Sequence, residues 1–181
     1  MTEDWKRGDW MHTFTGKKFY PMNPRAEDIC IEDIAHSLGL QCRYNGHVKE
    51  FYSVAEHCVL MSRAVSYDNA LWALLHDATE AYVGDMIRPL KKFMPKYVTA
   101  EDRVMAAICE RFGLTRLTMP KEVNDADNRI LLTERNALMV KTDHKWAVDD
   151  LEPLPVVIQG WTSFVAELMY LERFKELTDG R

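Results

Sequence analysis

Apolar residues recur at three- and four-residue spacing along most of this chain, which is the pattern of amphipathic helices. The spacing predicts helices over residues 29–38, 53–65, 68–76, 98–112, 122–140 and 162–177. The first helix is expected to end near Gly39, and Asp68 is expected to cap the third. Gly84 and Pro89 should break the chain between the third and fourth helices.

Two segments depart from the helical pattern. Residues 13–20 alternate around Gly16 and stop at Pro21, which predicts a short β-hairpin packed on a helical body. Residues 41–50 are polar and are expected to be irregular. The chain has no repeat, low-complexity tract or long linker, so residues 1–181 are interpreted as a single all-α domain, a helical bundle with an N-terminal hairpin.

Composition narrows the classes of function. A chain of 181 residues with 47% hydrophobic and 28% charged residues has ordinary globular composition. The formal net charge of -5 argues against a protein that grips polymeric nucleic acid, although a small anionic substrate needs only a local positive site. Apolar stretches such as residues 71–75 are too short to span a bilayer, and the N-terminus lacks an apolar signal core. A cytoplasmic protein without a membrane partner is therefore expected.

Two imidazoles and two carboxylates form the most informative set of polar residues. His57, the adjacent pair His76 and Asp77, and the later Asp127 fall on three separate predicted helices. If these helices bring the four groups together, they make a mixed nitrogen and oxygen site suited to a first-row divalent metal. Mn, Co, Zn, Fe and Ni fit such a site equally well.

Further acidic residues lie close to the His-Asp pair. Glu80 follows His76 by four residues and shares its helix face, and Asp85 comes directly after the Gly84 break. Three acids and a histidine within ten residues of an otherwise apolar helix favour a functional site, and a capped and solvated helix end is the alternative. Glu134, two helical turns beyond Asp127, is interpreted as an exposed glutamate, although support for the metal ligands is the alternative.

The ordered combination of these motifs resembles the HD-domain phosphohydrolases. The motifs are SVAEH at 53–57, LHDATE at 75–80, GD at 84–85 and DAD at 125–127. The chain is most similar to the branch of small bacterial 5'-deoxynucleotidases and phage deoxyadenosine triphosphate triphosphohydrolases. The resemblance covers most of the chain and implies a single HD-type domain, a nucleotide substrate and assembly into homo-oligomers.

The resemblance also implies roles for individual residues. One divalent metal would be held by four ligands, which are His57, His76, Asp77 and Asp127. Glu80 and Asp85 would act on the attacking water or the leaving group. Arg43 would contact the phosphate, and Tyr44 with the loop around it would face the sugar and base. His47, Arg88 and Lys91 are further candidates for substrate contact, with solvated surface residues as the alternative.

The leading functional hypothesis is a metal-dependent hydrolase that removes the 5'-phosphate of a deoxynucleotide by attack of activated water. The nearest alternative is a triphosphohydrolase that releases triphosphate from a deoxynucleoside triphosphate. A metal-bound nucleotide sensor without turnover is a third possibility. No histidine lies between Asp77 and Asp127, which favours one metal over the two-metal sites of some relatives.

Overall fold

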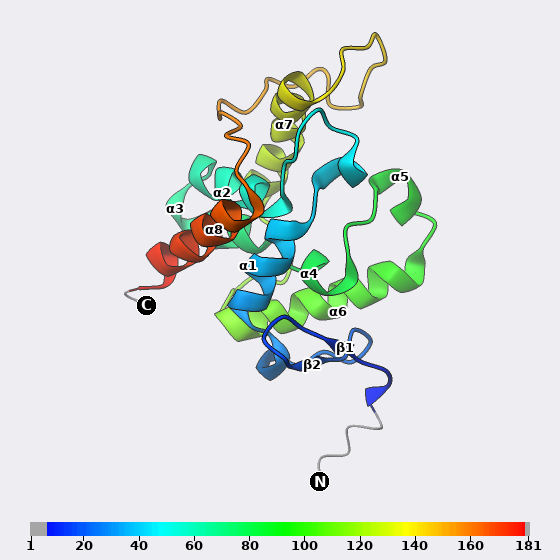
Figure 1. Ribbon diagram of the computed structural model, residues 1–181, viewed down its shortest axis with the longest axis vertical. Coiled ribbons are helices and arrows are strands. Elements are labelled where there is room, and N and C mark those ends of the chain that lie inside the picture. The colour runs from blue at the N-terminus through cyan, green and yellow to red at the C-terminus, as the bar shows by residue number, and fades with distance from the viewer. Residues whose placement is uncertain (1–6, 180–181) are drawn as a thin grey trace.

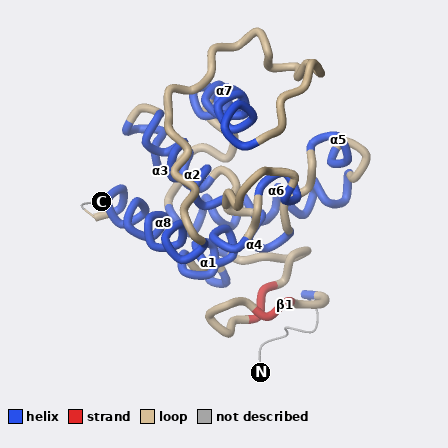
Figure 2. Tube along the Cα trace, turned by 45° about the horizontal axis from the view of Figure 1, so that its top comes forward, coloured by secondary structure: helices blue, strands red, loops and turns tan. Residues whose placement is uncertain are grey.

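The computed structural model describes residues 7–179, which are mostly helical with a two-stranded antiparallel hairpin near the N-terminus (Figures 1 and 2). The elements run in the order β1 (Met11–His12), β2 (Lys18–Phe19), η2 (Ala26–Asp28), α1 (Ile31–Leu40), η3 (Arg43–Gly46), α2 (Val54–Ala64), α3 (Tyr67–Leu75), α4 (Glu80–Val83), α5 (Arg88–Lys91), α6 (Pro95–Phe112), α7 (Lys121–Leu138) and α8 (Ser163–Thr178). The predicted fold class is confirmed.

The hairpin contacts the helices through Phe14 and Thr15 in its turn and through Phe19 in its second strand. Met11 pairs with Phe19 and His12 with Lys18, so the strands begin two residues earlier than the predicted segment. Gly16 has a φ of +84° in the connecting turn, a left-handed conformation that favours glycine. Phe19 is fully buried and its ring stacks on Tyr82 at 4.0 Å. The hairpin therefore contributes a buried side chain to the hydrophobic core.

The first helix ends one residue beyond Gly39, close to the predicted position, but the glycine serves a different purpose. Helix α1 runs to Leu40 and packs along α8. A Cβ atom at position 39 would lie 3.0 Å from the carbonyl oxygen of Ser163 and 3.4 Å from Cβ of Glu167. The glycine is therefore needed for the close approach of two helices and not for a change of chain direction.

The predicted cap of α3 is also corrected. Ser66 occupies the N-cap, and Asp68 lies inside the first turn, where a carboxylate still interacts favourably with the helix dipole. The backbone N–H of Ser66 donates to Glu122 on α7 at 2.9 Å. This tertiary contact fixes where the helix starts.

Pro89 lies in the first turn of the short helix α5, where its missing N–H costs nothing.

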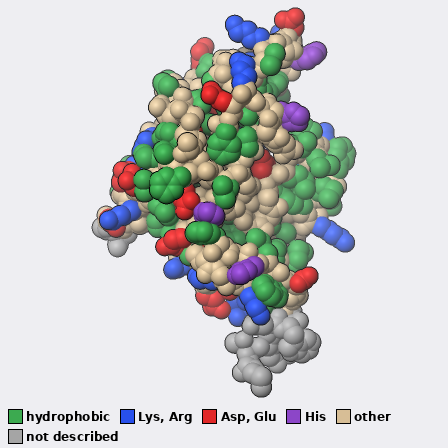
Figure 3. Space-filling view, in the orientation of Figure 1, with side chains coloured by type: hydrophobic (Ala, Val, Ile, Leu, Met, Phe, Trp, Pro, Cys, Tyr) green, Lys and Arg blue, Asp and Glu red, His purple; other side chains and the backbone are tan. Residues whose placement is uncertain are grey.

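One side of the molecule exposes a group of large apolar side chains. Figure 3 shows hydrophobic side chains gathered on the right, over α5 and the start of α6. The exposed apolar residues there are Ile87, Leu90, Phe93 and Met94.

Between residues 7 and 179, no helix combines the length and the apolar character needed to cross a bilayer.

A buried glutamate holds the segment that leads into α8. Glu56 on α2 is fully buried, and its carboxylate accepts backbone N–H bonds from Gln159, Gly160 and Trp161 at 2.7, 3.1 and 2.8 Å. Hydrogen bonds to a charged acceptor are stronger than neutral ones, and three of them satisfy most of the carboxylate. Glu56 therefore fixes the position at which the chain returns to α2.

We expect Glu56→Gln to lower the free energy of unfolding by about 3 kcal/mol, because a buried amide N–H₂ would face a backbone N–H. Urea denaturation followed by circular dichroism measures the change. Glu172→Gln on the exposed surface of α8 is the control and should stay within about 0.5 kcal/mol of the wild type. Equal stability of the two variants would contradict the role given to Glu56.

Candidate metal centre

Three helices bring His57, His76 and Asp127 together. His57 lies on α2, His76 at the C-terminal end of α3 and Asp127 on α7, and these helices pack against one another. All three residues are buried, with exposed fractions of 0%, 5% and 8%. The sequence prediction that separate helices would assemble these residues is confirmed.

Two carboxylate oxygens lie within 4.0 Å of both imidazole Nε2 atoms. The Nε2 atoms of His57 and His76 are 3.2 Å apart. An Asp77 carboxylate oxygen lies 3.5 Å from His57 Nε2 and 3.1 Å from His76 Nε2. An Asp127 carboxylate oxygen lies 3.5 Å and 4.0 Å from the same two nitrogens. Metal–ligand bonds of about 2.0–2.2 Å place neighbouring ligand atoms roughly 3–4 Å apart, so these separations fit one shared cation.

The protonation of the two imidazoles strengthens this interpretation. His57 Nδ1 lies 2.7 Å from the Glu134 carboxylate, and His76 Nδ1 lies 2.7 Å from the carbonyl oxygen of Ala73. Both partners are acceptors, so each Nδ1 must carry the proton. When both imidazoles are neutral, each Nε2 atom therefore carries a lone pair. These two lone pairs face each other and the carboxylates of Asp77 and Asp127. Four acceptors that face one another in a buried place require a positive charge between them.

The electrostatic environment of the pair agrees with this need. Burial alone would lower the pKa of His76, but the adjacent Asp77 carboxylate outweighs it, and the pKa is raised well above its ordinary value. Burial would raise the pKa of Asp77, but His76 lowers it far below its usual range. The site therefore attracts positive charge strongly, as a proton or as a metal ion.

Glu134 is a central residue of the site, and its interpretation as an exposed glutamate was wrong. It is fully buried on α7 and accepts hydrogen bonds from His57 Nδ1 at 2.7 Å, from the Tyr52 hydroxyl at 3.0 Å, and from the Tyr44 hydroxyl. An Arg43 nitrogen lies 3.3 Å away. Glu134 thus fixes the tautomer and the orientation of His57, as carboxylates do for histidines that bind metals.

Arg43 links Glu134 to the His-Asp pair. Its guanidinium is buried, and it donates to Glu134 at 3.3 Å and to Asp77 at 3.4 Å. Tyr44 and Asn45 follow in left-handed backbone conformations, with φ values of 56° and 51°. Non-glycine residues adopt this conformation at a cost, which the bonds from Tyr44 and Arg43 to Glu134 offset. The short 3-10 turn η3 is therefore attached to the candidate site.

Glu80 and Asp85 lie beside the cluster. Burial, followed by the charges of Asp77 and Asp85, raises the pKa of Glu80 well above its ordinary value. One oxygen of Glu80 is buried without a hydrogen-bond partner in the part of the chain that the structure describes. Burial also raises the pKa of Asp85, with Asp77 contributing. The Tyr97 hydroxyl on α6 donates to the carbonyl oxygen of Gly84 and so supports the turn before Asp85.

The other predicted substrate-contact residues have different positions. Arg88 forms an ion pair with the outer oxygen of Asp127 at 2.5 Å. Lys91 pairs with Glu101 on α6 at 2.6 Å. His47 is exposed at the end of η3, and its backbone N–H donates to Tyr44. Arg88 thus touches a candidate ligand, whereas Lys91 and His47 have no direct bond to the four converging groups.

A second possible ligand group overlaps the first but is less suited to a metal. It consists of Cys58, His76 and Asp77. Burial raises the pKa of the Cys58 thiol to about 11, so the thiolate that binds metals is scarce at neutral pH. The nitrogen of His76 that lies nearest Cys58 is Nδ1, which already donates to Ala73. The cluster around His57, His76 and Asp127 is therefore the better candidate.

These contacts define a mostly helical protein with a buried His/Asp cluster that is compatible with a divalent metal. The chain is 40% identical over 176 residues to the protein YfdR of Escherichia coli (strain K12), an alignment that covers 95% of this chain and 97% of YfdR. The chain therefore belongs to the same family as YfdR.

A second relative is the protein RCAP_rcc00048 of Rhodobacter capsulatus, which is 42% identical over 115 residues. That alignment covers 58% of this chain and 59% of the relative. Both relatives carry the description "uncharacterized protein", so their names assign no activity. No family model matches the chain.

Proposed function

We propose that this protein is a metal-dependent phosphohydrolase of the HD-domain type that acts on deoxynucleotides. The observation that carries the proposal is the convergence of two Nε2 lone pairs and two carboxylate oxygens, with both Nδ1 protons committed to Glu134 and Ala73. His57, His76, Asp77 and Asp127 would hold one divalent ion. Such an ion lowers the pKa of a bound water and neutralises charge on phosphoryl oxygens.

Proton transfer is assigned to the two acids beside the cluster. Glu80 has a buried oxygen without a partner among the described residues, so it can accept a hydrogen bond from a water next to the four ligands. Asp85, which the Gly84 turn holds close by, can return the proton to the leaving oxygen. The two carboxyl groups thus divide the acid and base roles that hydrolysis of a phosphate ester needs.

Arg43 is proposed to attract the phosphate. Its guanidinium lies 3.4 Å from the Asp77 carboxylate, so its positive charge lies beside the atoms that would bind the ion. The Arg43 N–H that makes only this long contact could donate a shorter charge-assisted hydrogen bond to a phosphate oxygen held beside the ion. Tyr44, in the same turn, and the loop over residues 38–47 are proposed to face the sugar and base.

Product analysis tests the proposal. Metal-stripped protein would be resupplied separately with Mn, Co, Zn or Mg and offered a panel of ribo- and deoxynucleoside mono- and triphosphates. Orthophosphate from deoxynucleoside monophosphates is the expected result. Tripolyphosphate from a triphosphate would instead assign the triphosphohydrolase reaction. A folded, metal-loaded protein that binds a nucleotide and releases no product would contradict the enzyme and favour the sensor.

We expect Glu80→Gln to lower turnover by about 10²–10⁴-fold while the metal content stays unchanged, because Glu80 is not among the four converging groups. Orthophosphate release and elemental analysis of the same sample measure both quantities. Asp102→Asn on the exposed surface of α6 is the charge-matched control and should leave both unchanged. Full activity of Glu80→Gln would remove Glu80 from the reaction.

A further inference from the structure

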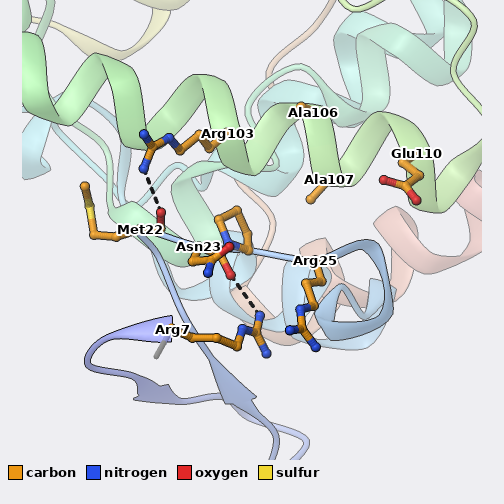
Figure 4. Close-up of a pocket in the computed structure, with 9 residues that line it drawn as sticks. Arg7, Met22, Asn23, Arg25, Arg103, Ala106, Ala107 and Glu110 are labelled. Atoms are coloured by element: carbon orange, nitrogen blue, oxygen red, sulfur yellow. Dashed lines mark hydrogen bonds between the residues drawn. The ribbon is translucent and has the colours of Figure 1, made fainter. Parts of the chain in front are cut away.

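A pocket of about 640 Å³ lies between α6 and the segment that precedes α1, on the side of the hairpin (Figure 4). Its lining includes three arginines, Arg7, Arg25 and Arg103, together with Asn23 and Glu110. Ala106 and Ala107 form part of the wall on α6, where their small side chains leave room. Although the chain has a net charge of -5, positive groups predominate in this cavity.

Arg7 is built into the pocket rather than lying on the surface. Its side chain is only 5% exposed, and its guanidinium stacks over the Tyr20 ring at 4.1 Å. One Nη atom donates to the carbonyl oxygen of Asn23 at 2.8 Å and to the Asp28 carboxylate. The Nε–H is buried and has no acceptor within residues 7–179. A buried donor without an acceptor is costly unless a ligand or a water satisfies it.

Arg103 and Arg25 retain free donors. Figure 4 shows Arg103 reaching from α6 toward Met22, and its Nη1 donates to that carbonyl oxygen at 2.8 Å. No carboxylate pairs with Arg103 in the described part of the chain. Arg25 is exposed and pairs with Glu27 through one nitrogen at 3.2 Å. Each guanidinium has five N–H donors, so most donors of both residues remain available to a ligand.

The pocket lies on a different face of α6 from the candidate metal centre. Glu101 pairs with Lys91, and Tyr97 donates to Gly84, so this face of α6 looks toward α4 and α5. Arg103 is two residues beyond Glu101, which turns it by roughly 200° around a helix axis. An anion held by Arg103 would therefore be distinct from one held beside His57 and His76.

We propose that this pocket binds a phosphate group, either free or as the terminal phosphomonoester of a small molecule. Guanidinium forks match phosphate oxygens in geometry as well as in charge, and Arg103 has no carboxylate partner among the described residues, whereas Arg7 and Arg25 each pair with one. Arg25 lies beside Arg7 in Figure 4 and donates to the phosphate oxygens, the unpartnered Nε–H of Arg7 is a second donor, and Arg103 adds positive charge from α6. Glu110, at the other end of the wall in Figure 4, is placed to accept hydrogen bonds from the organic part of a phosphomonoester.

Isothermal titration calorimetry tests this proposal. The metal-stripped, full-length protein is titrated with inorganic phosphate and, separately, with deoxyadenosine monophosphate. We expect saturable binding that weakens at least tenfold in Arg25→Ala, and less in Arg25→Lys, which keeps the charge but loses the fork, and in Arg103→Ala, which removes a more distant charge. Arg63→Ala, which removes one exposed charge from α2, is the control and should bind like the wild type. Binding of inorganic phosphate alone would identify free phosphate as the ligand, whereas binding of the nucleotide as well would identify a phosphomonoester.

Two results would overturn the proposal. The first is the absence of saturable binding of either probe. The second is binding that persists in Arg103→Ala and Arg25→Ala but disappears in His76→Ala, because the anion would then occupy the candidate metal centre. The second result would leave the proposed hydrolase intact, and loss of hydrolase activity in His76→Ala with unchanged phosphate binding would leave the pocket intact. The two proposals therefore fail separately.

Discussion

His76→Ala is expected to abolish stoichiometric metal binding. The wild-type protein, loaded with Mn or Co and passed over a desalting column, should retain about one ion per chain, whereas the variant should retain less than about a tenth of an ion. The reason is that His76 Nε2 lies 3.1–4.0 Å from the other three candidate ligand atoms. Elemental analysis by plasma mass spectrometry measures the content directly.

A matched pair of substitutions on α7 provides the control for this prediction. Asp127→Asn should lower metal content as His76→Ala does, since Asp127 is buried beside both imidazoles. Asp125→Asn changes a half-exposed carboxylate that pairs with Lys121, and it should leave the content unchanged. Equal metal content in all the variants would contradict the assignment of the ligands.

Glu134→Gln is expected to have the second largest effect, on stability and on metal affinity together. The substitution breaks the buried ion pair between Arg43 and Glu134 and leaves Arg43 with only its longer contact to Asp77, and breaking a buried ion pair costs about 3–5 kcal/mol. It also removes the charged acceptor that fixes His57, which typically lowers metal affinity by about 10–100-fold. Urea denaturation of the metal-free protein and competition with a fluorescent chelator measure the two effects.

Tyr52→Phe separates the role of Glu134 from general damage to the core. It removes one hydrogen bond to Glu134 and keeps the ring, so a loss of about 1 kcal/mol is expected with metal affinity nearly unchanged. A Glu134→Gln variant as stable and as metal-competent as Tyr52→Phe would show that Glu134 does not organise the site.

The pH dependence of the Glu134→Gln effect follows from the same contacts. Burial would raise the pKa of Glu134, but Arg43 and His57 outweigh it and lower the pKa from its ordinary value near 4.5 to about 2. Because the folded-state pKa is the lower one, the stabilising contribution is complete above about pH 4.5 and is lost as the pH falls toward 2. The difference corresponds to roughly 3 kcal/mol. The destabilisation caused by Glu134→Gln in metal-free protein should therefore shrink between pH 5 and pH 3.

The helices and the core of the site could be predicted because both depend on local spacing. The apolar periods locate α2, α6, α7 and α8 to within about three residues at each end. The His-Asp pair at the end of an apolar stretch, with a histidine and an aspartate on other helices, predicted the cluster that His57, His76 and Asp127 form. These features need no knowledge of which helix packs on which.

The features that the sequence could not specify depend on contacts between distant segments. Glu134 has the local surroundings of a polar helix, and only the arrival of Tyr44, Tyr52 and Arg43 from the chain before α2 makes it a buried residue. Its position two turns after Asp127 was the one available signal, because it places both side chains on one helix face. The role of Gly39 also depends on a distant segment, because the residue it must approach closely, Ser163, lies on a helix more than a hundred residues away.

The proposed function requires that the buried His/Asp cluster hold one ion and that hydrolysis of a deoxynucleotide depend on it. The most direct measurement is a titration of metal-stripped protein with Mn, with orthophosphate release from a deoxynucleoside monophosphate followed at each addition. Activity is expected to rise linearly and to reach its plateau at one equivalent of metal per chain, and His76→Ala is expected to stay inactive throughout. Folded protein that binds one equivalent of metal and releases no phosphate from any nucleotide, or activity that does not depend on added metal, would contradict it.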